Sequence, residues 1–137
     1  MRDIKFRIWC KNNNEWEKDD IAIKPNGFIL HLGTPKSMPC MVRSDTHIIQ
    51  FFTGLPDKNE REIYEDDLCK DEKETVYQVV WVEDHAEWGL KIIKTKWVSC
   101  QGLTFPLWQY TKDGICEVEV SGNSHDNPEL LEYGEIA

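Results

Sequence analysis

The chain has 137 residues, of which 40% are hydrophobic and 11% are aromatic. A chain of this size buries enough apolar surface to fold without a metal ion or disulfides, and this composition argues against intrinsic disorder. Its formal net charge of −9 argues against a nucleic-acid-binding protein, because such proteins normally present a basic face to phosphate.

The pattern of apolar residues predicts many short β-strands. At residues 4–9, apolar and charged side chains alternate with period two and place Trp9 on the polar face. Asparagines at 12–14 then indicate a hairpin turn before Trp16. Further strands are expected at residues 28–32, 48–52, 63–70, 76–82, 88–94, 96–98, 108–110 and 117–120.

Only the C-terminal tail has a helical pattern. Asn127 precedes Pro128, a residue pair typical of a helix N-terminus, and Leu130 and Leu131 follow as residues that would pack on the rest of the fold. Elsewhere turn residues separate the strands at intervals of about 8–12 residues, which favours a mainly β barrel or roll.

The negative charge is concentrated in the middle of the chain. Residues 1–56 carry +2, residues 57–87 carry −8 and residues 88–137 carry −3. One interpretation is that these acids maintain solubility and protect strand edges; the other is that they attract a basic partner. The candidate interaction surface consists of Glu65, Asp66, Asp67, Glu72 and Glu74.

The five cysteines stand far apart in the sequence, at Cys10, Cys40, Cys69, Cys100 and Cys116. A disulfide framework or a zinc ribbon would show closely spaced pairs, so reduced, buried thiols are expected. The N-terminus has no apolar signal region, and no apolar run approaches the roughly 18 residues of a membrane span. We therefore expect a cytoplasmic protein.

No complete catalytic motif is present. His85 and Glu87 reproduce the H-x-E of zinc deaminases, but the P-C-x-x-C that completes such a site is missing. A polar hairpin tip is the better interpretation of this segment. Acidic neighbours such as Asp67 should raise the pKa of the Cys69 thiol, which is the wrong direction for a nucleophile. We predict no catalytic residue, no metal ligand and no cofactor.

The six tryptophans offer a possible stacking surface for a carbohydrate or a base. Trp81, Trp88 and Trp97 lie within apolar strand patterns, so core positions are expected for them. The positions of Trp9, Trp16 and Trp108 are left open.

Three stretches of the sequence, read in order, resemble the YopX family of phage and prophage proteins. They are the opening MRDIKFRIW, the central FFTGLPDKNEREIYEDDLCK from Phe51 to Lys70, and the closing EVSGNSHDNPELLE from Glu119 to Glu132. Glu60 and Asp66 stand where the family pattern has glycine. We therefore expect tight turns at both positions and a positive φ at Asp66.

The resemblance implies a small SH3-type β-barrel with an N-terminal accessory β unit, to which the residue pattern of the tail adds a short C-terminal helix. The expected boundaries are residues 1–56 for the β unit, 57–122 for the barrel and 123–137 for the tail. It also implies a protein of the bacterial host cell, and it carries no known catalytic residues.

The leading hypothesis is a non-enzymatic phage or prophage accessory protein that binds a host or phage protein, for which a basic surface would suit the acidic segment. One alternative is a small hydrolase or nucleotide-modifying enzyme whose site forms only in three dimensions. Another is a barrel that binds nucleic acid. The sequence leaves homo-oligomerisation open.

Overall fold

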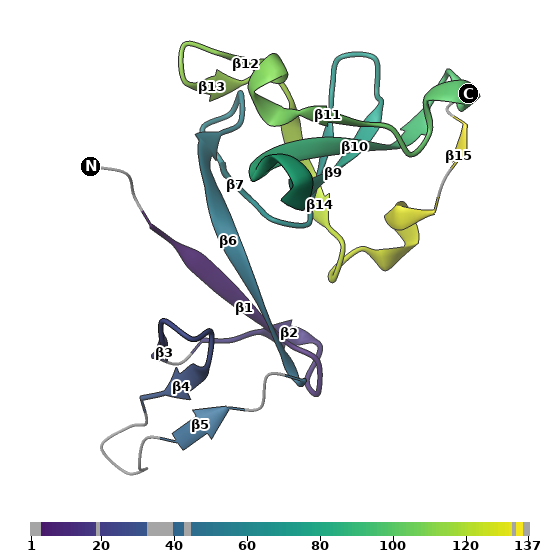
Figure 1. The fold of residues 1–137 in the computed structure, drawn as a ribbon. Helices are drawn as coiled ribbons and strands as arrows, with labels where there is room; N and C mark the ends of the chain where they lie inside the picture. Colours follow the sequence, from purple (N-terminus) through teal and green to yellow (C-terminus); the bar gives the residue numbers. More distant parts are fainter. Residues whose placement is uncertain (1–3, 19, 33–39, 43–44, 133, 136–137) are drawn as a thin grey trace. The chain divides into compact units, whose positions relative to one another are not determined.

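The computed structural model describes residues 4–18, 20–32, 40–42, 45–132 and 134–135. Over these residues the fold is mainly β, as predicted, and its helical segments are short 3-10 turns (Figure 1). The strands are β1 (Phe6–Cys10), β2 (Glu15–Trp16), β3 (Ile21–Ile23), β4 (Ile29–His31), β5 (Cys40–Val42), β6 (His47–Pro56), β7 (Glu62–Tyr64), β8 (Asp67–Lys70), β9 (Val76–Val82), β10 (Glu87–Thr95), β11 (Thr104–Pro106), β12 (Thr111–Lys112), β13 (Ile115–Cys116), β14 (Glu119–Asn123) and β15 (Gly134–Glu135). The 3-10 turns are η1 (Glu83–His85), η2 (Val98–Cys100), η3 (Leu107–Tyr110) and η4 (Pro128–Leu131).

The chain divides into two compact units. One contains residues 1–6 and 51–137, and the other contains residues 7–50. The division falls inside β1 and β6, which are neighbours in a four-stranded sheet of order β2-β1-β6-β7. The boundaries expected from the sequence, after residues 56 and 122, stay predictions.

In the unit of residues 7–50, the predicted hairpin joins β1 to β2. Trp9 lies opposite Trp16, and their rings meet edge to face with centroids 5.0 Å apart. The Arg7 guanidinium lies over the Trp16 ring, 4.3 Å from its centroid. Trp9 is therefore only 5% exposed, although the alternating pattern placed it on a polar face. Arg7, a charged residue of that pattern, lies over Trp16, and Trp16 in turn packs against Trp9.

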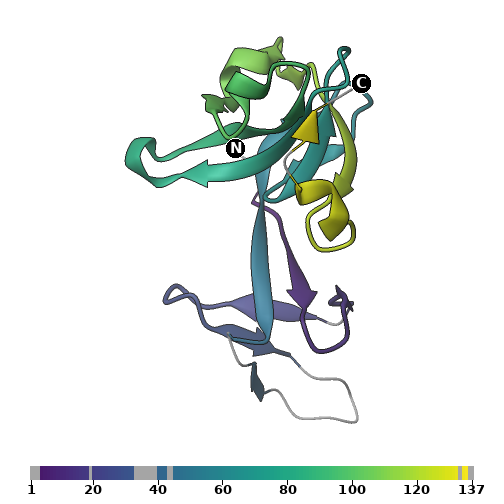
Figure 2. The ribbon, with the colours of Figure 1, turned by 90° about the vertical axis from the view of Figure 1, so that its right-hand side faces the viewer.

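In the larger unit, β8, β9, β10 and β11 follow one another as antiparallel neighbours. Strand β14 pairs with β8 at the opposite edge, and Figure 2 shows the long β9–β10 hairpin extending from this sheet. The β-branched and aromatic run of β9 explains why it forms a strand. The hydrophobic core of the larger unit consists of Ile63, Cys69, Tyr77, Val79, Leu90, Ile92, Leu107, Cys116, Val118 and Val120.

Two predicted strands are wrong. Residues 96–98 do not form one, because β10 ends at Thr95 and the turn η2 begins at Val98. Residues 108–110 belong to the 3-10 turn η3, which buries Leu107 and leaves Trp108 64% exposed. In both segments the apolar residues are too few to show a period, so strand and single-turn helix could not be distinguished.

The two turns at non-glycine positions are confirmed. Asp66 has φ 63° and Glu60 has φ 67°, both in the left-handed region that glycine favours. The Asp66 turn is held at three backbone positions: its N–H donates to the Val79 carbonyl, the Glu65 N–H donates to the Phe51 carbonyl, and the Ser124 N–H donates to the Asp66 carbonyl.

The C-terminal tail forms a single 3-10 turn, η4, with Pro128 at its start. The Asn127 side chain does not cap this turn; its Oδ1 accepts a hydrogen bond from the Asn123 N–H at 3.2 Å. Leu130 and Leu131 are half-buried.

Candidate functional site: an aromatic groove

The larger unit has an aromatic groove of about 440 Å³. It combines four aromatic side chains with two charged ones and is open to solvent. Its lining residues are Ile4, Lys5, Phe51, Phe52, Thr53, Gly54, Glu65, Trp81 and Trp88.

One wall of the groove is a pair of tryptophans on the β9–β10 hairpin. Trp81 and Trp88 lie directly opposite each other across the two strands, so their side chains emerge on the same face. Their rings meet edge to face with centroids 5.0 Å apart. Edge-to-face contact is one of the favoured geometries for a pair of aromatic rings.

The structure corrects the prediction that three tryptophans lie in the core. Trp81 is 45% exposed and Trp97 is 52% exposed, whereas Trp88 is half-buried against the core. A strand pattern that is apolar on both faces predicts burial on both sides. Here one face of the hairpin end is left without a covering layer among the described residues.

Strand β6 supplies further lining residues. Phe51 is 42% exposed, and the neighbouring Phe52 packs against Tyr64 with ring centroids 5.6 Å apart. The register between β6 and β7 shifts between Phe52 and Pro56, and within this irregular stretch Gly54 has φ 92°. Such bulges bend a strand, and this one directly follows the two consecutive phenylalanines that line the groove.

Two charged side chains accompany these rings. Lys5 forms an ion pair with Glu62 and lies over the Phe52 ring, 5.4 Å from its centroid. Burial raises the pKa of Glu65, and the neighbouring Asp66 raises it further, while a backbone hydrogen bond at Phe51 acts in the opposite direction. The Glu65 carboxylate is thus incompletely solvated, and a cation that approached it would stabilise its charged form.

Aromatic faces beside a carboxylate suit a side chain that has an apolar stem and a cationic end. The ring faces attract an ammonium or guanidinium group, and this attraction strengthens where water is excluded. Trp81 and Phe51 offer apolar contact area, and Glu65 offers the opposite charge. The groove therefore has the chemistry to bind a lysine or arginine flanked by apolar groups.

The residues of the predicted acidic surface have different environments. Asp67 is only 2% exposed and accepts hydrogen bonds from the Tyr64 N–H at 2.8 Å and from the Asn123 side chain at 3.2 Å. Asp66 accepts one from Gln78 at 3.0 Å, and Glu65 lines the groove. Only Glu72 and Glu74 of this set are exposed.

The other residues that the sequence offered as candidates for metal binding or catalysis lie outside the groove. His85 and Glu87 form the predicted hairpin tip, with Nδ1 3.4 Å from the Glu87 carboxylate. Among the described residues the structure brings no third metal ligand to this pair.

The pKa of the Cys69 thiol is well above its ordinary value, first because of burial and then because of Asp67, so the predicted direction is confirmed.

The described cysteines are free thiols. Cys10, Cys69 and Cys116 are buried, and Cys100 is half-buried. The side chain of Cys40 lies outside the described residues.

A single feature of the sequence could have revealed the groove. Phe51 and Phe52 are consecutive in one strand, and consecutive side chains of a strand cannot both face the core.

These features define a mainly β protein with an exposed aromatic groove. The family model described as YopX protein matches residues 5–132, and the chain therefore belongs to the YopX family. No curated protein sequence matches it.

Two similar solved structures come from Enterococcus faecalis and Bacillus subtilis. The crystal structure of protein EF1440 from Enterococcus faecalis has a TM-score of 0.59 and 23% identity, and the match covers 96% of this chain and 100% of that one. Protein yopX from Bacillus subtilis has a TM-score of 0.57 and 18% identity, with the same coverage. At these identities the similarity shows the fold alone.

No helix of the described segments is both long enough and apolar enough to span a membrane.

Proposed function

We propose that this chain is a non-enzymatic accessory protein of a phage or prophage that binds a host or phage protein through the aromatic groove. The observation that carries the proposal is the exposed aromatic surface formed by Phe51 and Trp81 beside the Glu65 carboxyl group. Membership of the YopX family supports the phage setting, because the sequence resembles a family of phage and prophage proteins.

The occupant we propose is an extended protein segment that carries a lysine or arginine between apolar residues. Large aromatic side chains in a concave site are typical centres of protein interfaces, because they bury much area at a small entropic cost. The half-exposed Phe51 and Trp81 would lose most of their contact with water in such a complex. Burying apolar area contributes roughly 25 cal/mol per Å² before the cost of association.

The charge of the chain favours a basic segment. The net charge is −9 and the middle of the sequence is its most acidic part. Exposed Glu72 and Glu74 would attract a basic partner during approach, and the Glu65 carboxylate would pair with its cation in the bound state. The same charge disfavours nucleic acid in the groove, although its rings could stack on bases.

A finer fold assignment belongs to this proposal: residues 57–122 form an SH3-type barrel. The order β11-β10-β9-β8-β14, with four consecutive antiparallel neighbours and a returning strand, supports it. Small barrels of this kind serve as binding modules, but the fold alone does not choose the ligand.

Selection from a display library of extended random peptides tests the proposal. We expect the wild-type chain to enrich peptides with a lysine or arginine between apolar residues. Trp81→Ala should weaken their binding at least tenfold, and Glu65→Gln should weaken the lysine and arginine peptides more than their apolar analogues.

Trp108→Ala is the matched control, because Trp108 is 64% exposed and does not line the groove. Its peptide affinities should equal those of the wild type. Enrichment of peptides that bind Trp81→Ala equally well would overturn the proposed site. Tighter binding of single-stranded nucleic acid than of any peptide at physiological salt would overturn the proposed partner class.

A further inference from the structure

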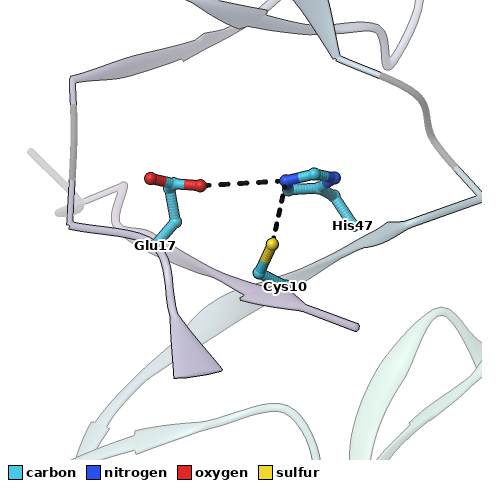
Figure 3. Close-up of side chains that lie close together, drawn as sticks. All are labelled: Cys10, Glu17 and His47. Carbon is cyan, nitrogen blue, oxygen red and sulfur yellow. Dashed lines mark hydrogen bonds and ion pairs between the residues drawn. The ribbon is translucent and has the colours of Figure 1, made fainter. Parts of the chain in front are cut away.

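We propose that Cys10, Glu17 and His47 form a binding site for a divalent cation of the Zn²⁺ type. All three residues belong to the unit of residues 7–50, so the site is independent of the groove. Figure 3 shows their side chains pointing toward one another. Their potential ligand atoms, a thiol sulfur, a carboxylate oxygen and an imidazole nitrogen, all lie within 4.8 Å of one another.

The three ligands lie on neighbouring segments of one sheet: β1, β6 and the residue that follows β2. The Lys11 N–H donates to the Thr46 carbonyl and the Phe52 N–H to the Lys5 carbonyl, and this register places Cys10 opposite His47 on β1 and β6. The Glu17 N–H donates to the Ile8 carbonyl on the other side of β1.

Residues two apart on a strand share a face, and residues directly opposite each other across two strands do as well. Glu17 lies opposite Ile8 and therefore on the face of Cys10, to which His47 also belongs. The backbone thus preorganises the three ligands before any metal binds.

Two of the three separations of the ligand atoms are close to those of a tetrahedral zinc site, and the third, between the Cys10 sulfur and the Glu17 oxygen, is within 4.8 Å. With Zn–S near 2.3 Å and Zn–N and Zn–O near 2.1 Å, tetrahedral geometry places sulfur and nitrogen about 3.6 Å apart and nitrogen and oxygen about 3.4 Å apart. Here Sγ of Cys10 lies 3.3 Å from Nε2 of His47, and that nitrogen lies 3.7 Å from Oε2 of Glu17. Each of these two separations differs from the tetrahedral value by about 0.3 Å.

A neighbouring residue orients the histidine. The Thr46 hydroxyl lies 2.8 Å from Nδ1 of His47. If Nδ1–H donates to this hydroxyl, the lone pair of Nε2 faces Cys10 and Glu17. Metal-bound histidines are held in this way by a hydrogen bond at the nitrogen opposite the metal.

The cluster opens onto a small polar cavity of about 240 Å³, which gives access from solvent. Cys10 and Glu17 form part of its wall together with Asn13, Glu15 and Lys18. Three protein ligands beside an open cavity leave the fourth position to water or to an exogenous ligand. The chemistry of the donor set, with one thiolate and one imidazole, favours Zn²⁺ over Mg²⁺ or Ca²⁺, which take mostly oxygen ligands.

The test is a titration of the reduced full-length chain with Co²⁺, followed by competition with Zn²⁺. We expect one Co²⁺ per chain, with the visible bands of tetrahedral cobalt and a near-ultraviolet thiolate-to-cobalt band, both lost when Zn²⁺ is added. Cys10→Ser should abolish the thiolate band. His47→Gln and Glu17→Gln should weaken binding at least tenfold, and Thr46→Val should weaken it about 10- to 100-fold through loss of orientation.

Cys100→Ser is the control for adventitious thiol binding, because Cys100 lies in the other unit; its spectrum and affinity should equal those of the wild type. Melting temperatures measured in a chelator separate loss of metal binding from loss of folding. Wild-type chain that binds no Co²⁺ or Zn²⁺ at micromolar concentration would overturn the proposal. A thiolate band that survives in Cys10→Ser would do so as well.

Discussion

Asp57 and Asp71 begin two loops that have the same hydrogen-bonded construction. In each loop, Oδ1 of the aspartate accepts the N–H groups two and four residues later, at 2.8 and 2.9 Å for Asp57 and at 2.9 and 3.0 Å for Asp71. The N–H three residues later donates to the aspartate carbonyl. That third position is Glu60 in one loop and Glu74 in the other, with φ 67° and 63°.

The two loops differ in what the second carboxylate oxygen does. In Asp57, Oδ2 accepts the Val120 N–H at 2.9 Å and so ties the loop to β14. In Asp71, Oδ2 accepts the Tyr77 hydroxyl at 2.9 Å, a bond between close neighbours. Asp57 is fully buried and Asp71 is half-buried.

We expect Asp57→Ala to cost more stability than Asp71→Ala. The first change leaves three backbone N–H groups without their acceptor at a buried position and should lower the free energy of unfolding by about 3–5 kcal/mol. The second should cost less, about 1–2 kcal/mol, because its bond from the Lys73 N–H is exposed and its other two bonds are only partly buried. Urea denaturation of both variants checks the order; an equal cost would show that burial of the Asp57 loop does not matter.

Glycine should stabilise the positive-φ positions of these loops. Glu60 and Glu74 are exposed, so Glu60→Gly and Glu74→Gly should each raise the free energy of unfolding by about 0.5–1 kcal/mol through relief of backbone strain.

Asp66→Gly should raise the free energy of unfolding by less than Glu60→Gly or Glu74→Gly does, because it also removes the hydrogen bond from Gln78. Thermal melts of the three variants and of Glu60→Ala provide the comparison. A Glu60→Gly variant less stable than wild type would contradict the strain argument.

Sequence reasoning found the features that depend on local periodicity and turn chemistry. The hairpin at Trp16 and the tip at His85 follow from neighbouring residues alone, and the left-handed turn at Asp66 was expected because the family pattern has glycine at that position. It missed which face of the β9–β10 hairpin is covered, because Trp81 has the same local pattern whether or not another layer packs on it. Exposure is decided by residues distant in the chain.

The three ligands of the proposed metal site were missed for a related reason. Cys10, Glu17 and His47 are too widely spaced to form a sequence motif, and they meet only because β1 lies between β2 and β6. The register of β1 against β6 joins residues about 40 positions apart. No periodicity within either strand specifies that register.

Glu65→Gln should stabilise the fold while weakening partner binding. The pKa of Glu65 is raised in the folded chain, so the folded state binds this proton more tightly than the unfolded chain does. The resulting penalty is fully present above the raised pKa and disappears as the pH falls below the ordinary glutamate value of about 4.3.

The variant should therefore melt at a higher temperature than wild type at pH 7 and at an equal temperature near pH 3. Melting curves across this range check the sign. A variant that is less stable at neutral pH would show that the charged carboxylate contributes to folding rather than to binding.

Gly122→Ala should destabilise the attachment of the C-terminal tail. A Cβ at this position would lie 2.6 Å from Oδ1 of Asn127, the atom that accepts the Asn123 N–H. The clash should cost about 1–3 kcal/mol. Asn127→Ala removes the clashing atom, so the double variant should be more stable than the sum of the two single changes predicts. Strict additivity in the double-mutant cycle would contradict this contact.

The central claim is that the aromatic groove binds another protein, and site-specific photocrosslinking in the native cells tests it most directly. Benzoylphenylalanine in place of Phe51 keeps an aromatic ring in the groove, and the same residue in place of Trp108 serves as the exposed control. We predict one discrete crosslinked protein from position 51, lost on Trp81→Ala, and none from position 108. No adduct from position 51, or the same adduct from both positions, would contradict the account.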